Sequence, residues 1–356
     1  MNASPWCFPA EWEPHEAVWL SWPLNPETWP GRLPYLQGRF GELAALISRH
    51  VTVRINAAGE AHAAIRETLN RAKADLACIE LFDHPTNDVW CRDHGPIFVV
   101  ARDGSGLTIT DWTYNAWGGK FPPWDLDNAV PARVAESLGL QRERSDLILE
   151  GGGIEGNGAG LLLTTEAVLL NPNRNPEWSR EQIEAELRRL LGVDRVFWLA
   201  RGIEGDDTDG HVDDFCRFYA PDQVLLAVES HRDDPNHAIL EENRERLREL
   251  SVEVRDLPMP DRLEANGGDW RLERLPASYA NFLITNGAVI VPIFGQPEND
   301  DRALGILREC FPGRKIEGID ARDFVYEGGA VHCLTQQQPT VGDPALAASF
   351  FSPGAA

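Results

Sequence analysis

The chain has 356 residues, of which 43% are hydrophobic and 25% are charged, a composition typical of a globular protein large enough to bury a sizeable core. Its formal net charge of −23 argues against nucleic acid as a partner, because phosphates require Lys and Arg opposite them. No apolar run approaches the roughly 20 residues that span a bilayer, and the first residues lack the basic and apolar stretches of a signal peptide, so we expect a cytoplasmic protein with no membrane partner.

The acidic charge has two explanations. Solubility is the simpler one, and an acidic surface also attracts a small cationic partner. The cysteines are scattered without CxxC spacing, at Cys7, Cys78, Cys91, Cys216, Cys310 and Cys333. This pattern predicts neither a zinc ribbon nor a disulfide framework, so we expect Cys333 to be a free thiol.

Four stretches have the form of a β-hairpin, in which two short apolar runs flank turn residues. The expected turns lie at Asp103-Gly104, Thr165-Glu166, Pro221-Asp222 and Asn286-Gly287. Between the hairpins, residues 180–191 and 237–250 place apolar residues at helical spacing with charge on the other face. We therefore expect two amphipathic helices there.

Short polar motifs beside glycine recur along the chain. They centre on Asp93, Glu150, His211, Asn281 and Cys333, at intervals of about 50 to 70 residues, which predicts a ring or array of similar α/β units. No Pro/Gly/Ser-rich linker and no block of charge divides the sequence. We therefore expect a single domain over residues 1–356.

The motif "GGAVHC" places Cys333 near the C-terminus. Taken alone, such a cysteine is most often a small buried hydrophobe, as we expect for Cys91 and Cys216. A thiol becomes a nucleophile when a base or a cation favours its thiolate. His211, in "GDDTDGHVDD", is the candidate base, held by a carboxylate such as Glu150 in "LEGGG".

Strand alternation makes two further predictions. If "GHVDDF" begins a strand, His211 and Asp213 share one face of it. The same alternation sends His332 and Cys333 to opposite faces, so we expect His332 to pack or to make a backbone contact. A simpler interpretation of His211 and Asp213 is a structural hydrogen-bonding pair.

Several acids accompany the candidate thiol. Carboxylates raise the pKa of a nearby thiol, which opposes formation of the anion. A cationic substrate resolves this conflict, because a guanidinium pairs bidentately with carboxylates and can favour the thiolate as it binds. Asp93, in "NDVWCRDHGP", could instead be a turn or cap residue. A Cys/His/Asp metal site also stays open, although no ligand pair has familiar spacing.

A resemblance to a known family joins these motifs. The stretches that carry it are "PAEWEPHEAVWLSWP", "NDVWCRDHGP", "NAWGGKFPPWDLDNAVP", "LEGGGIEGNGAGLLLTTEAVLLNPNRNP", "GDDTDGHVDDFCRF", "SYANFLITNGAVIVPIFGQPENDDRAL" and "EGGAVHCLTQQQP". In this order, from about residue 8 to residue 339, they resemble the agmatine deiminase and bacterial-type peptidyl-arginine deiminase family. The resemblance implies a five-bladed α/β propeller of ββαβ repeats, the pentein architecture.

The resemblance also implies roles by position. Cys333 matches the nucleophile, His211 the general acid/base and Glu150 its carboxylate partner, while Asp93 and Asp213 match the acids that hold the guanidinium. The implied substrate contacts are Asp207, Trp90, Trp117, Asn281 and Gly329. Neither a metal nor an organic cofactor is implied.

The implied reaction converts a terminal guanidinium to a ureido group and ammonia through a covalent amidino-cysteine intermediate. Agmatine, giving N-carbamoylputrescine, is the expected small cationic substrate, and a homo-oligomer is left open. The ammonium end of agmatine favours an acidic or aromatic wall, for which the acids Glu204, Asp206 and Asp207 with Trp90 and Trp117 are candidates. Peptidyl-arginine is the alternative substrate. A non-catalytic binder of guanidino ligands and a metal-dependent hydrolase are the other interpretations.

Overall fold

The strands of the computed structural model, which describes residues 4–265 and 273–341, form five separate sheets. Each sheet has three or four strands. In spatial order the sheets are β1 (Trp6–Cys7), β5 (Ile97–Ala101), β6 (Leu107–Thr113) and β7 (Gln141–Ile148); β10 (Arg195–Leu199), β9 (Leu161–Thr165) and β8 (Ile154–Gly156); β11 (Cys216–Ala220), β12 (Gln223–Val228) and β13 (Glu253–Pro258); β14 (Leu283–Ile284), β15 (Ala288–Ile293) and β16 (Lys315–Asp320); and β17 (Thr335–Pro339), β2 (His15–Ser21), β3 (Thr52–Ala57) and β4 (Ile79–Asp83).

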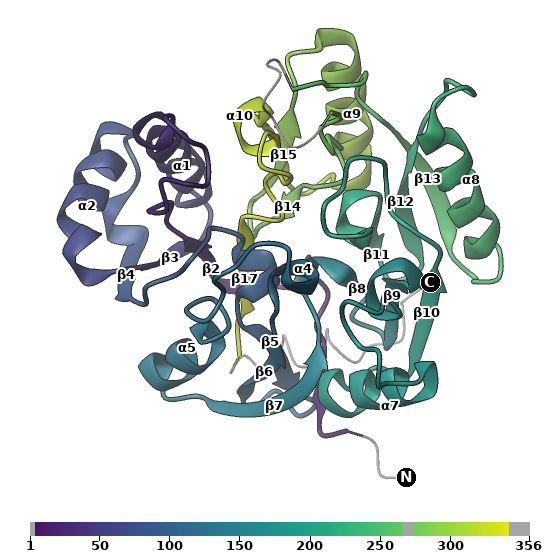
Figure 1. Ribbon diagram of the computed structural model, residues 1–356, viewed down its shortest axis with the longest axis horizontal. Helices are drawn as coiled ribbons and strands as arrows, with labels where there is room; N and C mark the ends of the chain where they lie inside the picture. Colours follow the sequence, from purple (N-terminus) through teal and green to yellow (C-terminus); the bar gives the residue numbers. More distant parts are fainter. Residues whose placement is uncertain (1–3, 266–272, 342–356) are drawn as a thin grey trace.

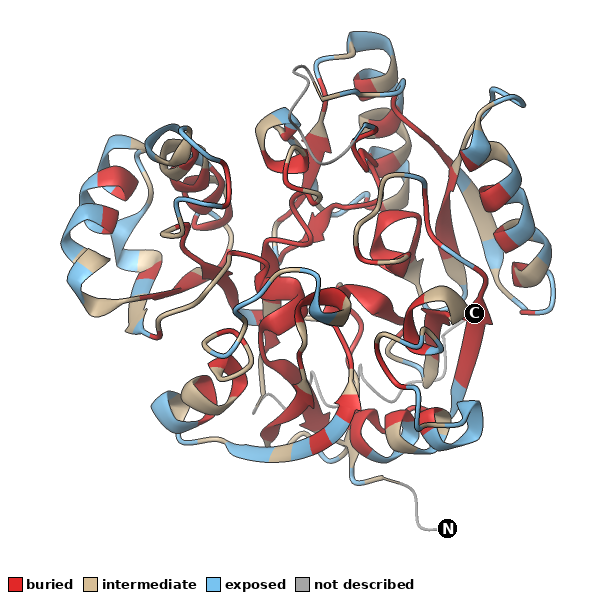
Figure 2. Cartoon of the chain, in the orientation of Figure 1, coloured by how far each residue is buried: buried red, intermediate tan, exposed pale blue. Residues whose placement is uncertain are grey.

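The longer helices lie toward the outside of the molecule (Figure 1). They are α1 (Leu33–Ile47), α2 (His62–Arg71), α5 (Val130–Leu138), α7 (Arg180–Leu191), α8 (Pro235–Leu247) and α9 (Pro297–Cys310). The short helical segments are α3 (Cys91–His94), α4 (Ala116–Gly119), α6 (Glu166–Leu169), α10 (Arg322–Val325) and the 3₁₀ turns η1 (Gly59–Ala61), η2 (Leu76–Cys78), η3 (Gly151–Gly153) and η4 (Val212–Asp214). Exposed residues gather on the outer helices, and buried residues gather toward the middle (Figure 2).

One connection scheme repeats in the sheets. An antiparallel hairpin such as β5–β6 is followed by a helix, here α5, and then by a strand that pairs in parallel with the second hairpin strand. The same order holds for β8–β9–α7–β10, β11–β12–α8–β13 and β14–β15–α9–β16. Each unit is therefore a ββαβ repeat.

The fifth sheet joins the two ends of the described chain. β17 pairs antiparallel with β2, with Thr335 opposite Leu20, and β2 pairs in parallel with β3. Because the first and last repeats share this sheet, the units close into a ring around the middle of the view in Figure 1. The predicted five-bladed α/β propeller is confirmed.

Helix α7 shows how the sequence determines the length of an outer helix. The Ser179 side chain accepts a hydrogen bond from the Gln182 backbone, and the Gln182 side chain accepts one from the Ser179 backbone, which completes a capping box. Gly192 ends the helix with a φ of 66°, a left-handed conformation that suits glycine. The predicted helix over residues 180–191 is confirmed.

The second predicted helix begins and ends slightly earlier than expected. α8 spans Pro235–Leu247 because the Asp234 side chain accepts a hydrogen bond from the Asn236 backbone and Pro235 occupies the first turn. Proline is favoured there because it donates no backbone hydrogen bond, and the first turn has no partner for one.

Three of the four hairpin turns lie where the sequence predicts them, and the turn expected at Thr165-Glu166 is wrong. The hairpin β8–β9 turns instead at residues 157–160, where the Asn157 side chain accepts hydrogen bonds from the backbone of Ala159 and Leu161. Glu166 begins helix α6 rather than a second strand. A short apolar run does not distinguish a strand from a buried helix, and this run contained both.

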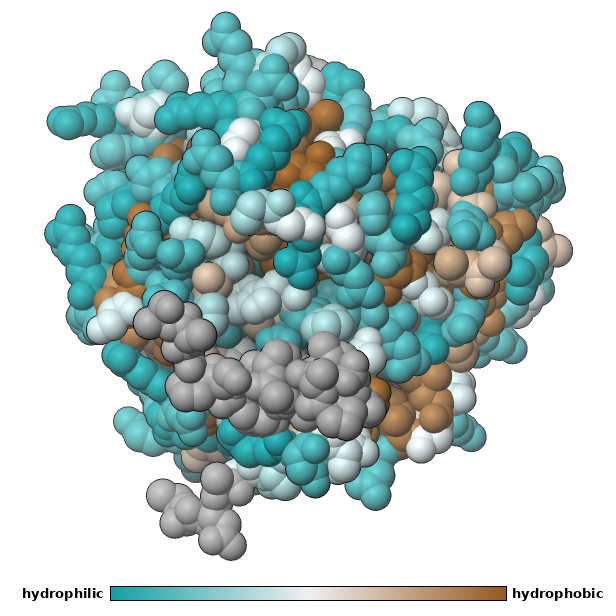
Figure 3. Space-filling view, turned by 180° about the vertical axis from the view of Figure 1, so that it is seen from behind, coloured by the Kyte–Doolittle hydropathy of each residue, from teal (hydrophilic) through white to brown (hydrophobic). Residues whose placement is uncertain are grey.

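The face seen from behind in Figure 3 is mostly hydrophilic, with apolar side chains interspersed. The large exposed hydrophobic residues among those described, Tyr35, Leu76 and Leu170, are separated in the sequence. In residues 4–265 and 273–341, none of the helices combines the length and the apolar character that a membrane crossing requires.

Candidate active site

A cavity of about 330 Å³ brings six of the predicted site residues together. The six that line it, which we call the cavity wall, are Trp90, Asp93, Trp117, Asp207, Gly329 and Cys333. The remaining four form a buried layer next to this wall, each at most 1% exposed: Glu150, His211, Asp213 and Asn281. The predicted residues thus divide into a surface that lines the cavity and a buried layer directly next to it.

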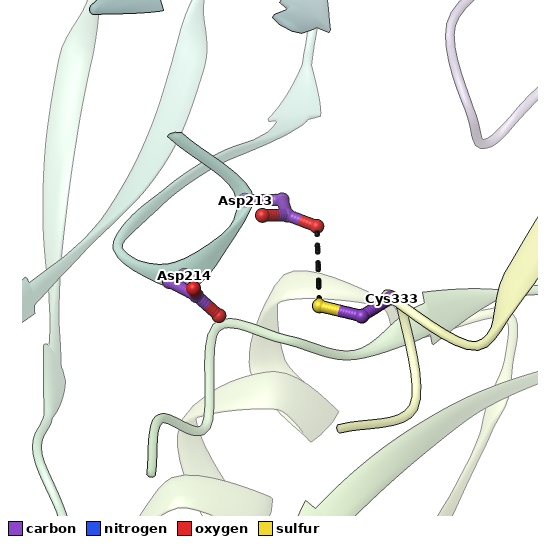
Figure 4. Close-up of side chains that lie close together, drawn as sticks. All are labelled: Asp213, Asp214 and Cys333. Carbon is purple, nitrogen blue, oxygen red and sulfur yellow. Dashed lines mark hydrogen bonds between the residues drawn. The ribbon is translucent and has the colours of Figure 1, made fainter. Parts of the chain in front are cut away.

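Cys333 lies in the turn that precedes β17, with its side chain on the cavity wall. The Asn281 amide nitrogen lies 3.0 Å from Cys333 Sγ, and Asp213 Oδ2 lies 3.8 Å from it (Figure 4). A Cβ atom on Gly329 would come within 2.4 Å of the Trp90 ring and 2.9 Å of Cys333 Cβ. Glycine is therefore required at Gly329 for the indole and the thiol to lie side by side.

Cys333, Asp213 and Asp214 offer three potential metal-ligand atoms within 4.8 Å of one another (Figure 4). The amide nitrogen of Asn281 lies 3.0 Å from the sulfur, 2.9 Å from Asp214 Oδ1 and 3.5 Å from Asp213 Oδ2. An amide that contacts all three atoms leaves little room for an ion among them. This geometry favours a hydrogen-bonded thiol over a metal centre.

Asp93 is held in a fixed orientation on the cavity wall. Its Oδ2 accepts a hydrogen bond from Trp117 Nε1 at 3.0 Å, and its Oδ1 accepts one from the Gly152 backbone at 3.0 Å. Burial raises the pKa of Asp93 to about 6, although His211 opposes that shift. Trp117 adopts a φ of 55°, a strained conformation for a bulky residue of the kind that is found at functional sites.

His211 lies between two acids in the buried layer. Its Nδ1 is 3.6 Å from Asp93 Oδ1, and its Nε2 is 3.8 Å from Glu150 Oε2. Burial lowers the pKa of His211, but Asp93, Glu150 and Asp213 outweigh burial and raise it to about 9. The imidazole is therefore protonated at neutral pH and can donate a proton to a leaving group.

Several atoms of the buried layer have no hydrogen-bond partner among the described residues. They are Nδ1 and Nε2 of His211, Oε2 of Glu150 and Oδ1 of Asp213. An unpaired buried polar atom costs about 1–3 kcal/mol, so a folded protein rarely keeps several together without a use. These atoms are available to a ligand or to a proton transfer.

The thiol of Cys333 is not ionised by its surroundings. Burial is the largest cause that raises its pKa well above the usual value, and Asp213, Asp214 and Asp93 raise it further. A cation bound beside the sulfur would oppose the effect of these acids. The site therefore suits a positively charged ligand.

Comparison with known proteins agrees with this geometry. A family model described as Porphyromonas-type peptidyl-arginine deiminase matches residues 7–339. The chain belongs to this deiminase family. It is 40% identical over 356 residues to an agmatine deiminase of Stutzerimonas stutzeri, a match that covers 93% of this chain and 95% of that protein. It is also 38% identical over 365 residues to an agmatine deiminase of Medicago truncatula, covering 94% of this chain and 96% of that protein.

Solved structures resemble the deiminase closely. An agmatine deiminase of Enterococcus faecalis matches with a TM-score of 0.87 and 34% identity, covering 96% of this chain and 98% of that one. A C. jejuni agmatine deiminase with substrate bound matches with a TM-score of 0.85 and 32% identity, covering 96% of this chain and 97% of that one.

One sequence-based expectation about the geometry of the deiminase site is wrong. "GHVDDF" does not begin a strand: Val212–Asp214 is the 3₁₀ turn η4, and β11 begins at Cys216, where pairing with Leu226 starts. Asn281 does not line the cavity, and its amide nitrogen lies 3.0 Å from the Cys333 sulfur, so its contact with the substrate stays a prediction.

His332 makes a stronger contact than expected. Its Nδ1 lies 2.6 Å from Asp213 Oδ2, and its Nε2 lies 2.8 Å from Glu11 Oε2. Although burial alone would raise the pKa of Asp213, the hydrogen bond from His332 is the largest of the effects that lower it. The expectation that His332 packs or makes a backbone contact did not include these side-chain contacts, because His332 lies in a turn, where strand alternation does not apply.

The acidic run before His211 divides between two roles. Asp207 lines the cavity, as predicted. Glu204 is exposed. The Asp206 side chain caps the backbone instead, because its Oδ2 accepts a hydrogen bond from the His211 backbone at 2.9 Å. Neither of these two lines the cavity, although both were candidates for the acidic wall at the ammonium end of agmatine.

Sequence reasoning missed two residues that support the deiminase site. Gly152 approaches His211 so closely that a Cβ atom would lie 2.6 Å from His211 Nδ1 and 2.8 Å from Asp93 Oδ1. The run of three glycines after Glu150 was a signal for this close approach. Arg174 donates a hydrogen bond to Glu150 at 2.6 Å, and nothing in its local sequence indicated that contact.

Proposed function

We propose that the protein is an agmatine deiminase, which hydrolyses agmatine to N-carbamoylputrescine and ammonia. The observation that carries this proposal is the charge of the cavity around Cys333. Of the described residues that line the cavity, six are acids and one, Lys120, is a cation. The acids are Glu27, Asp88, Asp93, Asp127, Asp207 and Glu327. Lys120 is already paired, with its Nζ 2.7 Å from Asp209 Oδ1.

This charge favours a substrate that is cationic at both ends. Agmatine carries a guanidinium and an ammonium, whereas free arginine adds an α-carboxylate that the acids would repel. The indoles of Trp90 and Trp117 provide aromatic faces for cation–π contact along the cavity wall. The agmatine deiminases to which the chain is similar support the same substrate.

The proposed reaction starts when the guanidinium binds beside Asp93 and Cys333. Its positive charge favours the thiolate, and the thiol proton leaves to solvent. The Cys333 sulfur forms a bond to the guanidinium carbon. The His211 imidazolium then donates its proton to the departing nitrogen, the C–N bond breaks and ammonia leaves.

The second half of the reaction releases the enzyme. Neutral His211 takes a proton from water, and the hydroxide oxygen bonds to the carbon of the amidino-cysteine intermediate. The C–S bond breaks, the electron pair returns to Cys333, and the proton of the added hydroxyl group passes to the thiolate, which leaves the neutral ureido product and restores the thiol. In this scheme Glu150 stabilises the protonated His211, and Asp213 offers its unpaired Oδ1 to the substrate or the thiol.

Ammonia release from three substrates at equal concentration tests the proposal. We expect a clear preference for agmatine over free arginine and over an arginine peptide with blocked ends. A faster reaction with the peptide would favour the peptidyl-arginine alternative. Binding of agmatine without any ammonia release would favour a non-catalytic binder. The cytoplasmic location, the single domain over residues 1–356, whose ends lie outside the described residues, and a homo-oligomer remain predictions.

A further inference from the structure

A series of side chains with alternating charges runs from the cavity into the buried layer. Lys120, which lines the cavity, pairs with Asp209, and Asp209 Oδ2 lies 2.8 Å from Arg174 Nη1. Arg174 Nε then donates to Glu150 Oε1 at 2.6 Å, and Glu150 Oε2 faces His211 Nε2 at 3.8 Å. Four consecutive charge pairs therefore connect a cavity residue to the predicted general acid/base.

Arg174 is built to fix one carboxylate orientation. The side chains of Arg174 and Glu150 are both fully buried, so their ion pair is shielded from water. The remaining guanidinium nitrogens are also held, because Nη2 donates to the Thr208 carbonyl at 3.0 Å and Nη1 to the Asn173 side chain at 2.7 Å. With Oε1 of Glu150 occupied, Oε2 is left unpaired toward His211.

The outer half of this series, from Lys120 through Asp209 to Arg174, connects three loops. Lys120 follows α4, Arg174 follows α6 and Asp209 lies in the loop before His211. Lys120 Nζ also contacts the Asp207 carbonyl oxygen at 2.6 Å. Asp209 has a φ of 73°, which is uncommon for a residue other than glycine and shows that its neighbours determine its conformation.

We propose that Arg174 is a positioning residue for the Glu150–His211 pair, and that Asp209, itself paired with the cavity-lining Lys120, holds Arg174 in place. This inference rests on the proposed deiminase function. Arg174 does not touch the cavity, so it acts on proton transfer through Glu150 rather than on substrate binding.

The charges around His211 predict how this series of charge pairs affects the pKa of His211. His211 is faced by Asp93 from α3, by Glu150 before η3, by Asp213 from η4 and by Asp206, which accepts from its backbone. Burial would raise the pKa of Glu150, and Arg174 holds it below its usual value. Without Arg174, Glu150 would lose negative charge, and the pKa of His211 would fall.

Kinetics of Arg174 variants with agmatine test the proposal. We expect Arg174→Met to lower kcat by about a hundredfold. Arg174→Lys keeps the charge but loses the planar guanidinium with its several N–H donors, and it should lower kcat by about tenfold. KM should change by less than about twofold in both, because uniform binding is unaffected. The high-pH limb of kcat/KM should move to lower pH by about one unit in Arg174→Met. Asp209→Asn and Lys120→Met should show the same pattern with smaller losses.

A matched control separates positioning from a general effect on folding. Arg54 is a largely buried arginine on β3 that pairs with Glu16 and Glu80 and does not line the cavity. Arg54→Lys should keep the wild-type kcat and pH profile. Equal losses in Arg54→Lys and Arg174→Lys, or an unshifted pH profile in Arg174→Met, would overturn the proposal.

An NMR titration of His211 distinguishes this proposal from the function on which it rests. The His211 signal is identified by its loss in His211→Asn, and its pKa is then compared between wild type and Arg174→Met. A lower pKa in the variant supports the placement of Arg174, and an equal pKa contradicts it, whether or not agmatine is the substrate. Absence of ammonia release by the wild type would reject the proposed function alone.

Discussion

Burial raises the pKa of two cysteines of this deiminase, but only one of them lines the cavity. Burial raises the pKa of Cys91 to about 12, and its thiol lies 3.9 Å from the amide nitrogen of Asn56. Burial is also the largest cause that raises the pKa of Cys333, where Asp213, Asp214 and Asp93 add to the effect and the side chain lies on the cavity wall. A bound cation can neutralise acids, whereas it cannot restore lost solvent. A raised pKa therefore does not exclude a nucleophile when nearby acids, whose charge a bound substrate offsets, contribute to it.

The largest expected effect contrasts these two thiols. Cys333→Ser should lose nearly all ammonia release from agmatine while remaining folded, because a serine hydroxyl is a far weaker nucleophile in this setting. Cys91→Ser should keep most of the activity of the folded enzyme. Circular dichroism and steady-state kinetics of both variants measure the contrast. Normal turnover by Cys333→Ser would remove the distinction.

Removing the charge of Asp93, one of the acids that line the cavity, should have the next largest effect. Asp93→Asn keeps the shape of the side chain but removes its charge, so kcat/KM for agmatine should fall by at least about tenfold. Asp213→Asn should show a similar loss through the thiol and His332. Asp111, a buried acid that pairs with Arg142 outside the site, provides a matched control as Asp111→Asn. Unchanged kcat/KM in both site variants would contradict the roles proposed for these acids.

The ionisation of the thiol predicts a moderate effect on alkylation. Because its pKa is raised well above the usual value, Cys333 should be almost entirely protonated at pH 7, and its reaction with iodoacetamide should be slow and accelerate as pH rises. A small guanidinium that leaves the sulfur accessible should accelerate the reaction at pH 7. Mass spectrometry of the Cys333 peptide reports the rate. Fast alkylation of the free enzyme at pH 6 would instead indicate a preformed ion pair between Cys333 and His211.

The smallest expected effect is that of a chelator. Because the Asn281 amide lies among the three potential metal ligands around Cys333, we expect dialysis against EDTA to leave kcat unchanged. Elemental analysis before and after dialysis is the control. Loss of activity that returns with an added divalent ion would instead support the interpretation of the protein as a metal-dependent hydrolase.

Much of the fold could be predicted from local sequence. Turn residues at Pro221-Asp222 and Asn286-Gly287 place their hairpins correctly, because these residue types suit a turn whatever surrounds them. The hairpin at residues 157–160 was missed because the decisive hydrogen bonds come from one side chain, that of Asn157, and the apolar run beyond it resembled another strand.

The site was predicted by motif, but its division into cavity wall and buried layer was not. Which side chain faces the cavity depends on contacts between residues far apart in the chain. His332 and Glu11, for example, are 321 positions apart and meet at 2.8 Å. Arg174 has no local signature, because its partners Glu150 and Asp209 belong to different loops. Only the closed ring of repeats brings these residues together.

The identity of the nucleophile is tested most directly by trapping the intermediate. Wild-type enzyme is mixed with agmatine, quenched with acid during turnover and digested. The masses of the cysteine-containing peptides are then measured by mass spectrometry. We predict that the Cys333 peptide gains the mass of agmatine less ammonia, and that the Cys91 and Cys216 peptides stay unmodified. An adduct on another residue, or continued turnover by a protein whose Cys333 is fully blocked, would contradict the account.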